Sequence, residues 1–198
     1  MSRFFYSFSR VVLTPTFGLL YRLRVEGLQH LPREGPVVLV GNHASFLDPP
    51  VLGTAMPRPV SFLALEKFFR KPLLGSIFRA AGAIPIPQDG VSRDAFRTAA
   101  EVLRKGRVLG IFPEGGRTMA PPLDPFKEGA FRIARMGSAS VIPVAILGTD
   151  RIWPRTRRLP RLFGRIRVIL APPIPAGTKP AEAMARAREA ILERLTSA

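Results

Sequence analysis

Residues Pro36–Pro50 read PVVLVGNHASFLDPP, and this stretch decides the fold class. It opens with a short apolar run, rich in valine and ended by glycine, which is typical of a strand covered on both faces. The polar side chains of Asn42, His43 and Asp48 follow directly. Open α/β sheets carry their sites beyond the carboxyl ends of their strands, so the stretch predicts a buried strand with a functional loop after it.

The rest of the chain alternates short apolar runs with helical patterns. Further strands are expected at 23–27, 60–65, 83–86, 108–112, 140–147 and 166–170. Helical spacing covers 92–105, a segment from Asp124 to about Gly137 with Pro125 in its first turn, and the residues after Thr178. This pattern predicts a single α/β domain over residues 23–198, with a mostly parallel or mixed seven-stranded sheet flanked by helices.

Residues 1–22 form an apolar and aromatic N-terminal segment. Its uncharged part, Val11–Tyr21, has eleven residues, well short of the roughly 20 that cross a bilayer. A signal peptide fits poorly, because no small-residue cleavage site follows and Arg22 and Arg24 interrupt the run. The composition favours a helical segment in the membrane interface, with a buried first helix as the alternative. We expect a peripheral or monotopic protein at the cytoplasmic face of the cell membrane.

The composition limits the possible chemistry. The chain has 198 residues, no cysteine and a formal charge of +16. These values suit one globular domain and exclude a disulfide scaffold, thiolate catalysis and the usual cysteine-based metal sites. The positive charge predicts a polyanionic partner without saying which one.

Much of this charge lies between Arg151 and Arg167. The interval contains seven arginines and no acidic residue, interleaved with aromatic and aliphatic side chains. Such a pattern fits a nucleic-acid footprint, an anionic-lipid surface or a site for cofactor phosphates, and a solvated basic loop is the simpler alternative.

His43 and Asp48 form the first candidate site. If residues 44–47 make a tight turn into a helix, the Asp48 carboxylate can reach one imidazole nitrogen and leave the other free as a base. Ser45 is a weaker alternative as a nucleophile. The second histidine, His30, precedes Leu31-Pro32 in a predicted turn and is expected at the surface.

The second candidate site is FPEGGRT, residues 112–118, which also follows an apolar run. Gly115 and Gly116 allow the backbone to approach a ligand, and Arg117 is a bidentate donor for phosphate. The segment is not a P-loop, because it lacks the glycine-lysine ending of that motif. A turn stabilised by an ion pair between Glu114 and Arg117 is the alternative.

Four segments in this order resemble the motifs of the glycerolipid acyltransferases, the family of the 1-acylglycerol-3-phosphate (lysophosphatidic acid) acyltransferases. NHASFLDPP (42–50) resembles the family's N-H-x-x-x-x-D motif, and FPEGGRT its F-P-E-G-T-R-S block. FKEGAF (126–131) and VIPVAI (141–146) are similar to the two blocks that follow.

Two positions depart from the family pattern. Gly116 stands where the family has threonine, which removes a hydroxyl group. In GAIPIPQ (82–88), Gln88 stands where the family's acceptor-binding arginine is expected. Glutamine offers a phosphate no charge, so this departure bears on the identity of the acyl acceptor.

The resemblance implies a role for each candidate residue. His43 would take the proton of an acceptor hydroxyl and Asp48 would orient the imidazole. Arg117 would hold the acceptor phosphate, with Lys127 as a further phosphate ligand or a solvated side chain. Glu114 would bind an acceptor hydroxyl or a basic neighbour. Asn42, Gly115, Gly116 and Gln88 complete the expected substrate-binding set.

The expected function is transfer of a fatty acyl chain from acyl-CoA or acyl-carrier protein to 1-acylglycerol 3-phosphate, forming phosphatidic acid. No metal or further cofactor is expected. The expected partners are the acyl thioester, a lysophospholipid and an anionic membrane surface, with no nucleic acid. One alternative is another lyso-lipid or amino-lipid acceptor. An alternative of another class is a basic nucleic-acid-binding or lipid-binding protein without catalysis.

Overall fold

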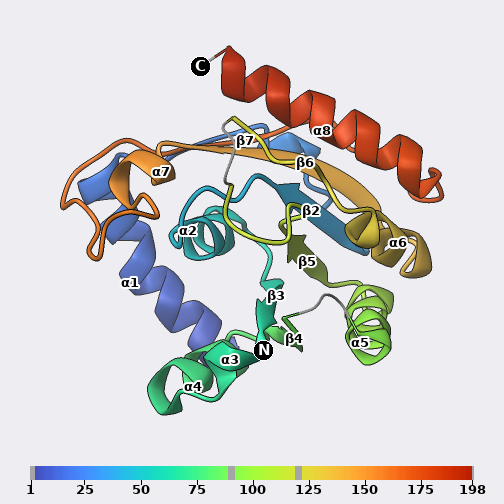
Figure 1. Cartoon of the computed structure of the whole chain (residues 1–198), viewed down its shortest axis with the longest axis horizontal. Helices are drawn as coiled ribbons and strands as arrows, with labels where there is room; N and C mark the ends of the chain where they lie inside the picture. The colour runs from blue at the N-terminus through green and yellow to red at the C-terminus, as the bar shows by residue number, and fades with distance from the viewer. Residues whose placement is uncertain (1–2, 89–91, 119–121, 198) are drawn as a thin grey trace.

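The computed structural model describes residues 3–88, 92–118 and 122–197 (Figure 1). The strands are β1 (Arg24–Glu26), β2 (Val37–Gly41), β3 (Val60–Leu65), β4 (Ile84–Ile86), β5 (Val108–Ile111), β6 (Ser140–Leu147) and β7 (Arg167–Leu170). The helices are α1 (Arg3–Tyr21), η1 (Leu28–His30), α2 (Asp48–Ala55), α3 (Glu66–Phe69), α4 (Pro72–Ala80), α5 (Arg93–Arg104), α6 (Gly129–Met136), α7 (Thr149–Ile152) and α8 (Pro180–Thr196). Met1 and Ser2, the start of the predicted N-terminal segment, lie outside the described residues.

The strands form one seven-stranded sheet in the order β1-β7-β6-β2-β5-β3-β4. All neighbouring pairs are parallel except β6 and β7, which are antiparallel. The predicted mixed sheet is therefore confirmed, and each predicted strand agrees with the observed one to within one residue at either end. β2 lies between β5 and β6, with Val37 in register with Val108 and Ser140. The carboxyl ends of these three parallel strands are consequently neighbours.

Alternate residues of β2 enter two different hydrophobic cores. Val38 and Val40 pack in the core that contains buried residues of α5, α6 and α8. Val37 and Leu39 pack in the core that contains residues of α1 and α2. Figure 1 shows these two groups of helices on opposite faces of the sheet. Since both faces are covered, β2 is apolar throughout instead of alternating with polar residues.

Helix α1 belongs partly to the core. Phe17 and Tyr21 near its end are buried with residues of the sheet, whereas Val11 and Leu19 are highly exposed. The segment therefore combines the two alternatives considered from its sequence, a core helix at its end and an exposed apolar surface along its length. Within the part of the chain that the structure describes, no helix is long and apolar enough to span a membrane.

The predicted start of α6 at Asp124 is wrong. The helix begins five residues later, at Gly129. The backbone N–H of Asp124 donates to Glu114 Oε2 at 3.1 Å, and the N–H of Lys127 donates to the Pro113 carbonyl oxygen at 2.8 Å. These contacts hold the segment against the loop after β5, which overrides its tendency to start a helix at Asp124 and Pro125.

The prediction that His30 lies at the surface holds only in part. Its side chain is half-buried, and Nδ1 lies 3.0 Å from the Leu170 carbonyl oxygen. The contact depends on the turn at Gly27, which has a φ of +77° and leaves no room for a Cβ atom beside Leu170. His30 therefore links the β1–η1 turn to the end of β7, far in sequence but adjacent in the sheet.

Gly148 gives a direct test of the connection between β6 and α7. It has a φ of +88°, and an added Cβ would overlap the Arg165 carbonyl oxygen. We expect Gly148→Ala to lower the free energy of unfolding by about 3 kcal/mol, from backbone strain plus overpacking. Gly177 is the matched control, because it has the same φ of +88° with open space around it. Gly177→Ala should cost only about 1–2 kcal/mol. Urea unfolding of both variants measures the difference, and equal losses would contradict the packing argument.

Candidate active site

The loops after β2 and β5 meet at one edge of the sheet. β2 ends at Gly41, two residues before His43, and β5 ends at Ile111, three residues before Glu114. The N–H of Thr118 donates to the His43 carbonyl oxygen at 2.6 Å, so the two loops are in direct contact. The topology thus brings the two predicted motif segments together, as expected for parallel neighbours.

Asp48 orients His43. Nδ1 of His43 lies 2.9 Å from Oδ2 of Asp48, and an ionised carboxylate only accepts hydrogen bonds, so Nδ1 carries the hydrogen and Nε2 keeps its lone pair. Asp48 is fully buried, whereas the His43 side chain is 18% exposed. Oδ2 also accepts the backbone N–H of Ser45 at 2.7 Å. The helix α2 starts at Asp48 with Pro49 and Pro50 in its first turn, positions that favour an acid and proline.

Aromatic rings pack against one face of the imidazole. His43 stacks on Phe112 with ring centroids 4.4 Å apart, and Phe112 lies parallel to Phe62 with centroids 6.1 Å apart. Gly41 and Gly110 make room for this column, because a Cβ at Gly41 would press on the Phe112 ring and one at Gly110 would overlap the Phe62 ring. Packing thus fixes the plane of the imidazole as well as its hydrogen bond.

Glu114 joins the two loops. Its Oε1 accepts the backbone N–H of His43 at 2.7 Å. Its Oε2 accepts the Thr118 hydroxyl at 2.7 Å and the Asp124 N–H at 3.1 Å. Burial is the main cause that raises the pKa of Glu114, with a smaller contribution from the charge of Asp124, and the three hydrogen bonds act in the opposite direction. The substrate contact expected for Glu114 stays a prediction, and the structure gives this carboxylate a positioning role.

Asn42 is likewise used inside the protein. Its side-chain nitrogen donates to the Ile146 carbonyl oxygen at 2.9 Å, and its oxygen accepts the Ile146 N–H at 2.7 Å. The residue is buried, so its amide extends the pairing between β2 and β6 by one step. The substrate contact predicted for Asn42 remains a prediction, and the observed bonds fix the start of the loop after β2, residues 42–47, which we call the histidine loop.

Ser45 connects this loop to α7 and the chain that follows it. Its hydroxyl donates to the Trp153 carbonyl oxygen at 2.9 Å and accepts the Leu47 N–H at 3.2 Å. The side chain is fully buried. A hydroxyl has one hydrogen to donate, and here it goes to a carbonyl instead of the imidazole. This arrangement does not support Ser45 as a nucleophile.

Arg117 lies beside the histidine loop. Its guanidinium carbon is 3.7 Å from the centroid of the Phe46 ring, a close cation–π contact. Burial is the main cause that lowers the pKa of Arg117, the positive charge of Arg155 lowers it further, and the charge of Asp48 raises it. The positive charge of Arg155 therefore lies close enough to that of Arg117 for the two to interact.

Lys127 and the two glycines lie together at the other side of this turn. Gly115 has a φ of +75°, and an added Cβ would come within 2.8 Å of the Lys127 Nζ atom. The missing side chain at Gly115 thus lets the ammonium group lie against the turn. Gly116 has open space on its Cβ side, so the threonine of the family pattern would fit here without moving a neighbour.

Gln88 takes part in none of the contacts described above. It is an exposed turn residue two positions after β4, and residues 89–91 beyond it lie outside the described part of the chain. Its predicted role in acceptor binding therefore remains a prediction. Metal ligation was not expected, and among the described residues no group of three or more His, Asp or Glu side chains could hold a metal ion.

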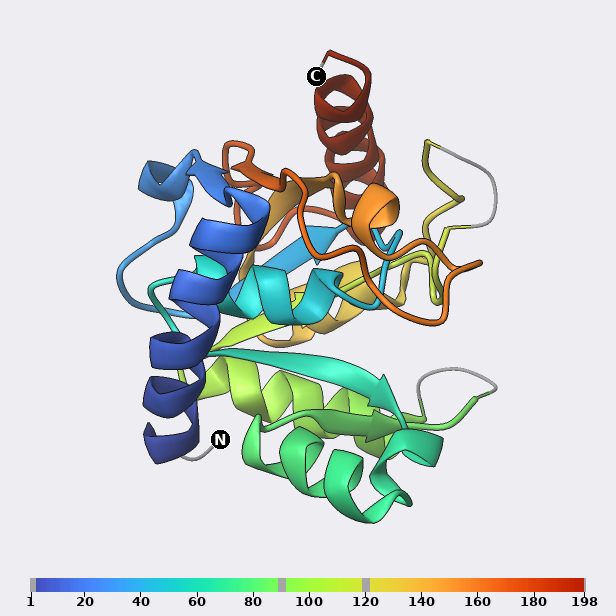
Figure 2. The same cartoon turned by 90° about the vertical axis from the view of Figure 1, so that its left-hand side faces the viewer.

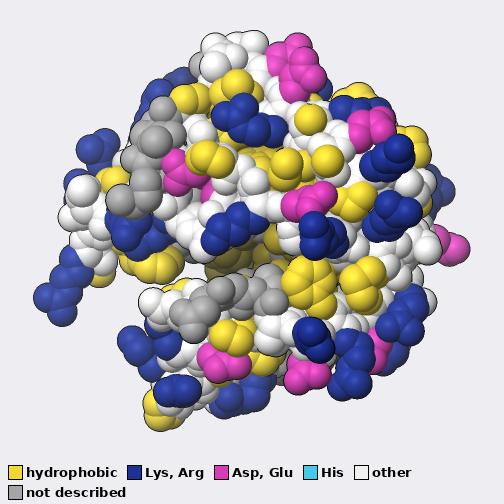
Figure 3. All heavy atoms as spheres, turned by 45° about the vertical axis from the view of Figure 1, so that its right-hand side comes forward, with side chains coloured by type: hydrophobic (Ala, Val, Ile, Leu, Met, Phe, Trp, Pro, Cys, Tyr) yellow, Lys and Arg dark blue, Asp and Glu magenta, His cyan; other side chains and the backbone are white. Residues whose placement is uncertain are grey.

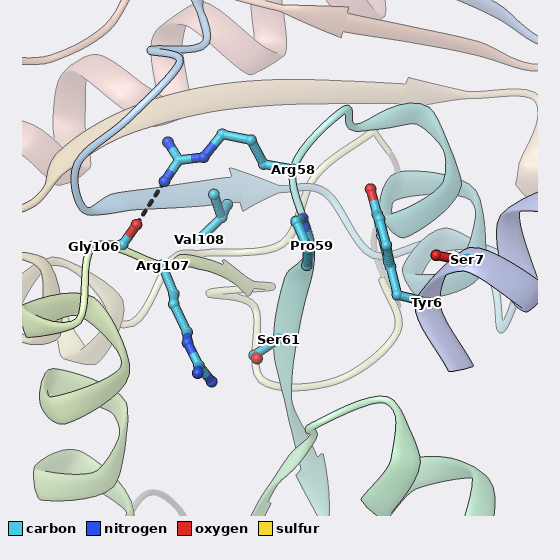
Figure 4. A pocket seen from close by; sticks show the side chains of 8 residues that line it. All are labelled: Tyr6, Ser7, Arg58, Pro59, Ser61, Gly106, Arg107 and Val108. Carbon is cyan, nitrogen blue, oxygen red and sulfur yellow. Dashed lines mark hydrogen bonds between the residues drawn. The ribbon is translucent and has the colours of Figure 1, made fainter. Parts of the chain in front are cut away.

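The cavity drawn in Figure 4 lies at the opposite end of the strands. It has a volume of about 490 Å³ and is lined by residues of α1 and by the starts of β3 and β5. Arg58 at its wall donates to the carbonyl oxygens of Gly106, Gly35 and Pro32 at 2.6–2.9 Å. Burial is the main cause that lowers the pKa of Arg58. This arginine ties loops together and is remote from the strand ends that carry His43.

Sequence reasoning missed several contributors. Phe112 and Thr118 lie inside the quoted FPEGGRT segment, but their contacts to His43 depend on the pairing of β2 with β5. Arg155 lies in the arginine-rich interval. The sequence of that interval indicated a concentration of positive charge but not where in the fold the charge would lie. Only the folded chain brings its charge near Arg117.

An Asp-oriented histidine beside a half-buried arginine, at the carboxyl edge of a mixed α/β sheet, is an arrangement suited to an enzyme that uses histidine as a base. Residues 22–147 match the family described as Acyltransferase, and the chain belongs to this family. The family membership accounts for the histidine and glutamate segments, which a nucleic-acid-binding module would leave unexplained.

Curated relatives carry more specific names. A chloroplastic 1-acyl-sn-glycerol-3-phosphate acyltransferase of Arabidopsis thaliana is 33% identical over 159 residues, covering 78% of this chain and 44% of the relative. A protein of the same name from Bacillus subtilis is 28% identical over 144 residues, covering 72% of this chain and 71% of the relative. A chloroplastic relative of the same name from Brassica napus is also 33% identical over 159 residues. The chain spans less than half the length of these two plant proteins, at 44% and 45%.

A solved structure supports the fold independently. The crystal structure of the 1-acyl-sn-glycerophosphate acyltransferase of Thermotoga maritima has a TM-score of 0.82 to this chain with 24% identity. It covers 98% of this chain and 78% of the other. At this identity the likeness establishes the single α/β domain with its seven-stranded sheet.

Replacing Glu114 tests the link between the two loops. Glu114→Gln places an amide N–H₂ opposite groups that already donate, so we expect the free energy of unfolding to fall by about 2 kcal/mol. Glu128→Gln is the control, because Glu128 forms its ion pair with Arg132 at the surface of α6. That change should cost less than about 0.5 kcal/mol.

The difference in free energy of unfolding between the wild type and Glu114→Gln is expected to depend on pH. Folding raises the pKa of Glu114 above its ordinary 4.5, so the folded protein binds a proton that the unfolded chain releases. The free energy of unfolding of the wild type should therefore rise, relative to that of Glu114→Gln, as the pH falls from neutral toward 4.5. Urea unfolding of both proteins across this range measures the gap, and a constant gap would contradict a raised pKa.

Proposed function

We propose that this protein transfers an acyl chain from a thioester of CoA or acyl-carrier protein to the free hydroxyl of 1-acylglycerol 3-phosphate. The product is phosphatidic acid. The observation that carries the proposal is the 2.9 Å contact between His43 Nδ1 and Asp48 Oδ2 beside the guanidinium of Arg117. The names of the relatives from plants and Bacillus subtilis support the same choice of acceptor.

The chemical step follows from the state of His43. Nε2 has a free lone pair and accepts the proton of the acceptor hydroxyl as its oxygen attacks the thioester carbonyl carbon. The new C–O bond forms and the C–S bond breaks. The imidazolium returns the proton to the leaving thiolate, which restores the neutral imidazole. Asp48 stabilises the imidazolium in between, since its buried carboxylate is already in contact with Nδ1.

The acceptor phosphate is proposed to bind at Arg117, with Arg155 as a second positive charge. A phosphate dianion between two guanidinium groups accepts charge-assisted hydrogen bonds and removes their mutual repulsion. Lys127 supplies a further charge across Gly115. In this arrangement Arg155, in the segment after α7, supplies the positive charge that the family's arginine would provide at position 88. An acceptor that carries a phosphate therefore still suits the site. Another lyso-lipid or an amino-lipid is the alternative acceptor.

Features of the surface suit lipid substrates. Figure 3 shows a hollow whose interior is lined largely by hydrophobic side chains, with Lys and Arg around its rim. A hydrophobic interior with basic surroundings suits acyl chains that carry a phosphate head group. The exposed apolar side chains of α1 are proposed to contact the membrane interface at the cytoplasmic face of the cell membrane.

The two histidines of the chain provide a matched test of the catalytic step. We expect His43→Ala to lower kcat by about 10²–10⁴-fold, because it removes the proposed general base. His30→Ala should leave kcat close to that of the wild type, since the His30 ring contacts the Leu170 carbonyl oxygen on β7 instead of the loops after β2 and β5. The assay follows thiol release from acyl-CoA with 1-acylglycerol 3-phosphate as acceptor. Full activity of His43→Ala, with product confirmed by mass, would overturn the mechanism.

Acceptor selectivity tests the role of Arg117. Arg117→Gln should raise the KM for 1-acylglycerol 3-phosphate by about 10–100-fold, the loss expected for hydrogen bonds to a charged group. The KM for a monoacylglycerol, which lacks the phosphate, should change little. Arg135→Gln, an exposed position on α6, controls for net charge. Equal losses with both acceptors would contradict phosphate binding, and a wild type that prefers an acceptor without phosphate would favour the alternative acceptor.

A further inference from the structure

The catalytic site leaves most of the arginine-rich interval unexplained. Between α7 and β7 the chain runs from Trp153 to Ile166 without a strand or a helix. We call residues 153–166 the basic loop. Its arginines are residues 155, 157, 158, 161 and 165, and it contains no acidic residue. Five positive charges on one connection repel each other and require an anionic partner or solvent.

Three large apolar side chains in the basic loop face solvent. Leu159 is 71% exposed, Leu162 is 64% exposed and Phe163 is 66% exposed. A loop that only needed to remain solvated would not carry three such side chains within five residues. Apolar side chains between arginines form the pattern of an interfacial segment, in which the former enter the hydrocarbon boundary and the latter remain with phosphates.

The basic loop is attached to the end of α1. The N–H of Gly164 donates to the Leu20 carbonyl oxygen at 3.1 Å, and the N–H of Ile166 donates to that of Tyr21 at 2.9 Å. The Tyr21 hydroxyl donates to the Arg161 carbonyl oxygen at 3.1 Å. Figure 1 shows α1 and the basic loop on the same side of the molecule. The exposed side chain of Leu19 therefore belongs to the residue directly before Leu20 and Tyr21, which contact the basic loop.

The basic loop is also attached to the histidine loop. The Trp153 carbonyl oxygen accepts the Ser45 hydroxyl at 2.9 Å, and the Trp153 ring lies 5.7 Å from that of Phe46, centroid to centroid. Figure 2 shows the basic loop, in orange, reaching toward the edge of the sheet that carries the loop after β5. A surface on which this loop rests would therefore lie beside the entrance to the active site.

We propose that the basic loop is a second membrane contact, which binds anionic phospholipids and holds the active site at the bilayer surface. Leu159, Leu162 and Phe163 enter the interface, and the arginines bind lipid phosphates. A bilayer is favoured over an acidic protein because the exposed apolar residues continue from the loop to α1, which extends the contact beyond one small patch. The inference rests on the proposed function at a membrane, but its test does not require catalysis.

Charge-removing variants test the electrostatic part. The side chains of Arg158 and Arg161 are exposed. Replacing both by glutamine should weaken binding to vesicles of phosphatidylglycerol and phosphatidylcholine by about 25-fold, at about 5-fold per charge. Arg104→Gln with Arg135→Gln removes the same charge from exposed positions on α5 and α6. This control should change binding by less than about 3-fold, because charges beyond a Debye length are screened. Equal losses in the two double variants would overturn the proposal.

An apolar variant tests insertion. Phe163→Ser should weaken vesicle binding by about tenfold at a salt concentration that screens the arginines, since it removes an exposed aromatic side chain from the interface. Met136→Ser is the control, because Met136 is also exposed, at 56%, but lies on α6. Sedimentation with vesicles measures both. Unchanged binding of Phe163→Ser would show that the loop does not insert.

Two further measurements separate this inference from its alternatives. If Arg158→Gln with Arg161→Gln keeps vesicle binding but loses transfer from acyl-carrier protein, the basic loop docks the carrier and the membrane proposal is overturned. Transfer to a water-soluble short-chain 1-acylglycerol 3-phosphate without vesicles should be within about twofold of the wild type in that variant. Absence of this transfer in the wild type would reject the proposed function alone, because vesicle binding is measured independently.

Discussion

The hydrogen bond from the His43 backbone to the Glu114 carboxylate is the interaction on which the site depends. The sheet places the ends of β2 and β5 side by side, but the loops beyond them have no strand pairing of their own. Glu114 replaces that pairing by accepting hydrogen bonds from His43, Thr118 and Asp124. Burial makes the charged carboxylate unfavourable, and these donors offset part of that cost.

The histidine loop is held by three sets of hydrogen bonds. Glu114 binds it from the loop after β5, Asn42 binds Ile146 of β6, and Ser45 binds Trp153 after α7. These bonds use backbone groups or buried polar side chains, whereas the imidazole of His43 keeps some exposure. These hydrogen bonds fix the backbone around His43 and do not occupy its Nε2 atom, as a preorganised site requires.

The sequence was sufficient for the architecture because each strand is a short apolar run that is buried on both faces. It was also sufficient for the pair of His43 and Asp48, since five residues of chain restrict how far apart the two side chains can lie. It was insufficient for α6. The helix begins only at Gly129, because two backbone N–H groups before it donate hydrogen bonds to the loop after β5. The positioning roles of Asn42 and Glu114 depend on partners distant in sequence, which no local pattern specifies.

The second oxygen of Asp48 bears on how the histidine works. Oδ1 is buried and accepts no hydrogen bond from the described residues, whereas Oδ2 accepts from both His43 and Ser45. The carboxylate charge is therefore only partly neutralised by neutral donors, and it is felt by Arg117. A positive charge on the imidazole would interact with this buried carboxylate more strongly than the neutral ring does, because the surroundings screen it weakly. The buried carboxylate is thus placed to stabilise an imidazolium, which is the role that the proposed mechanism gives to Asp48.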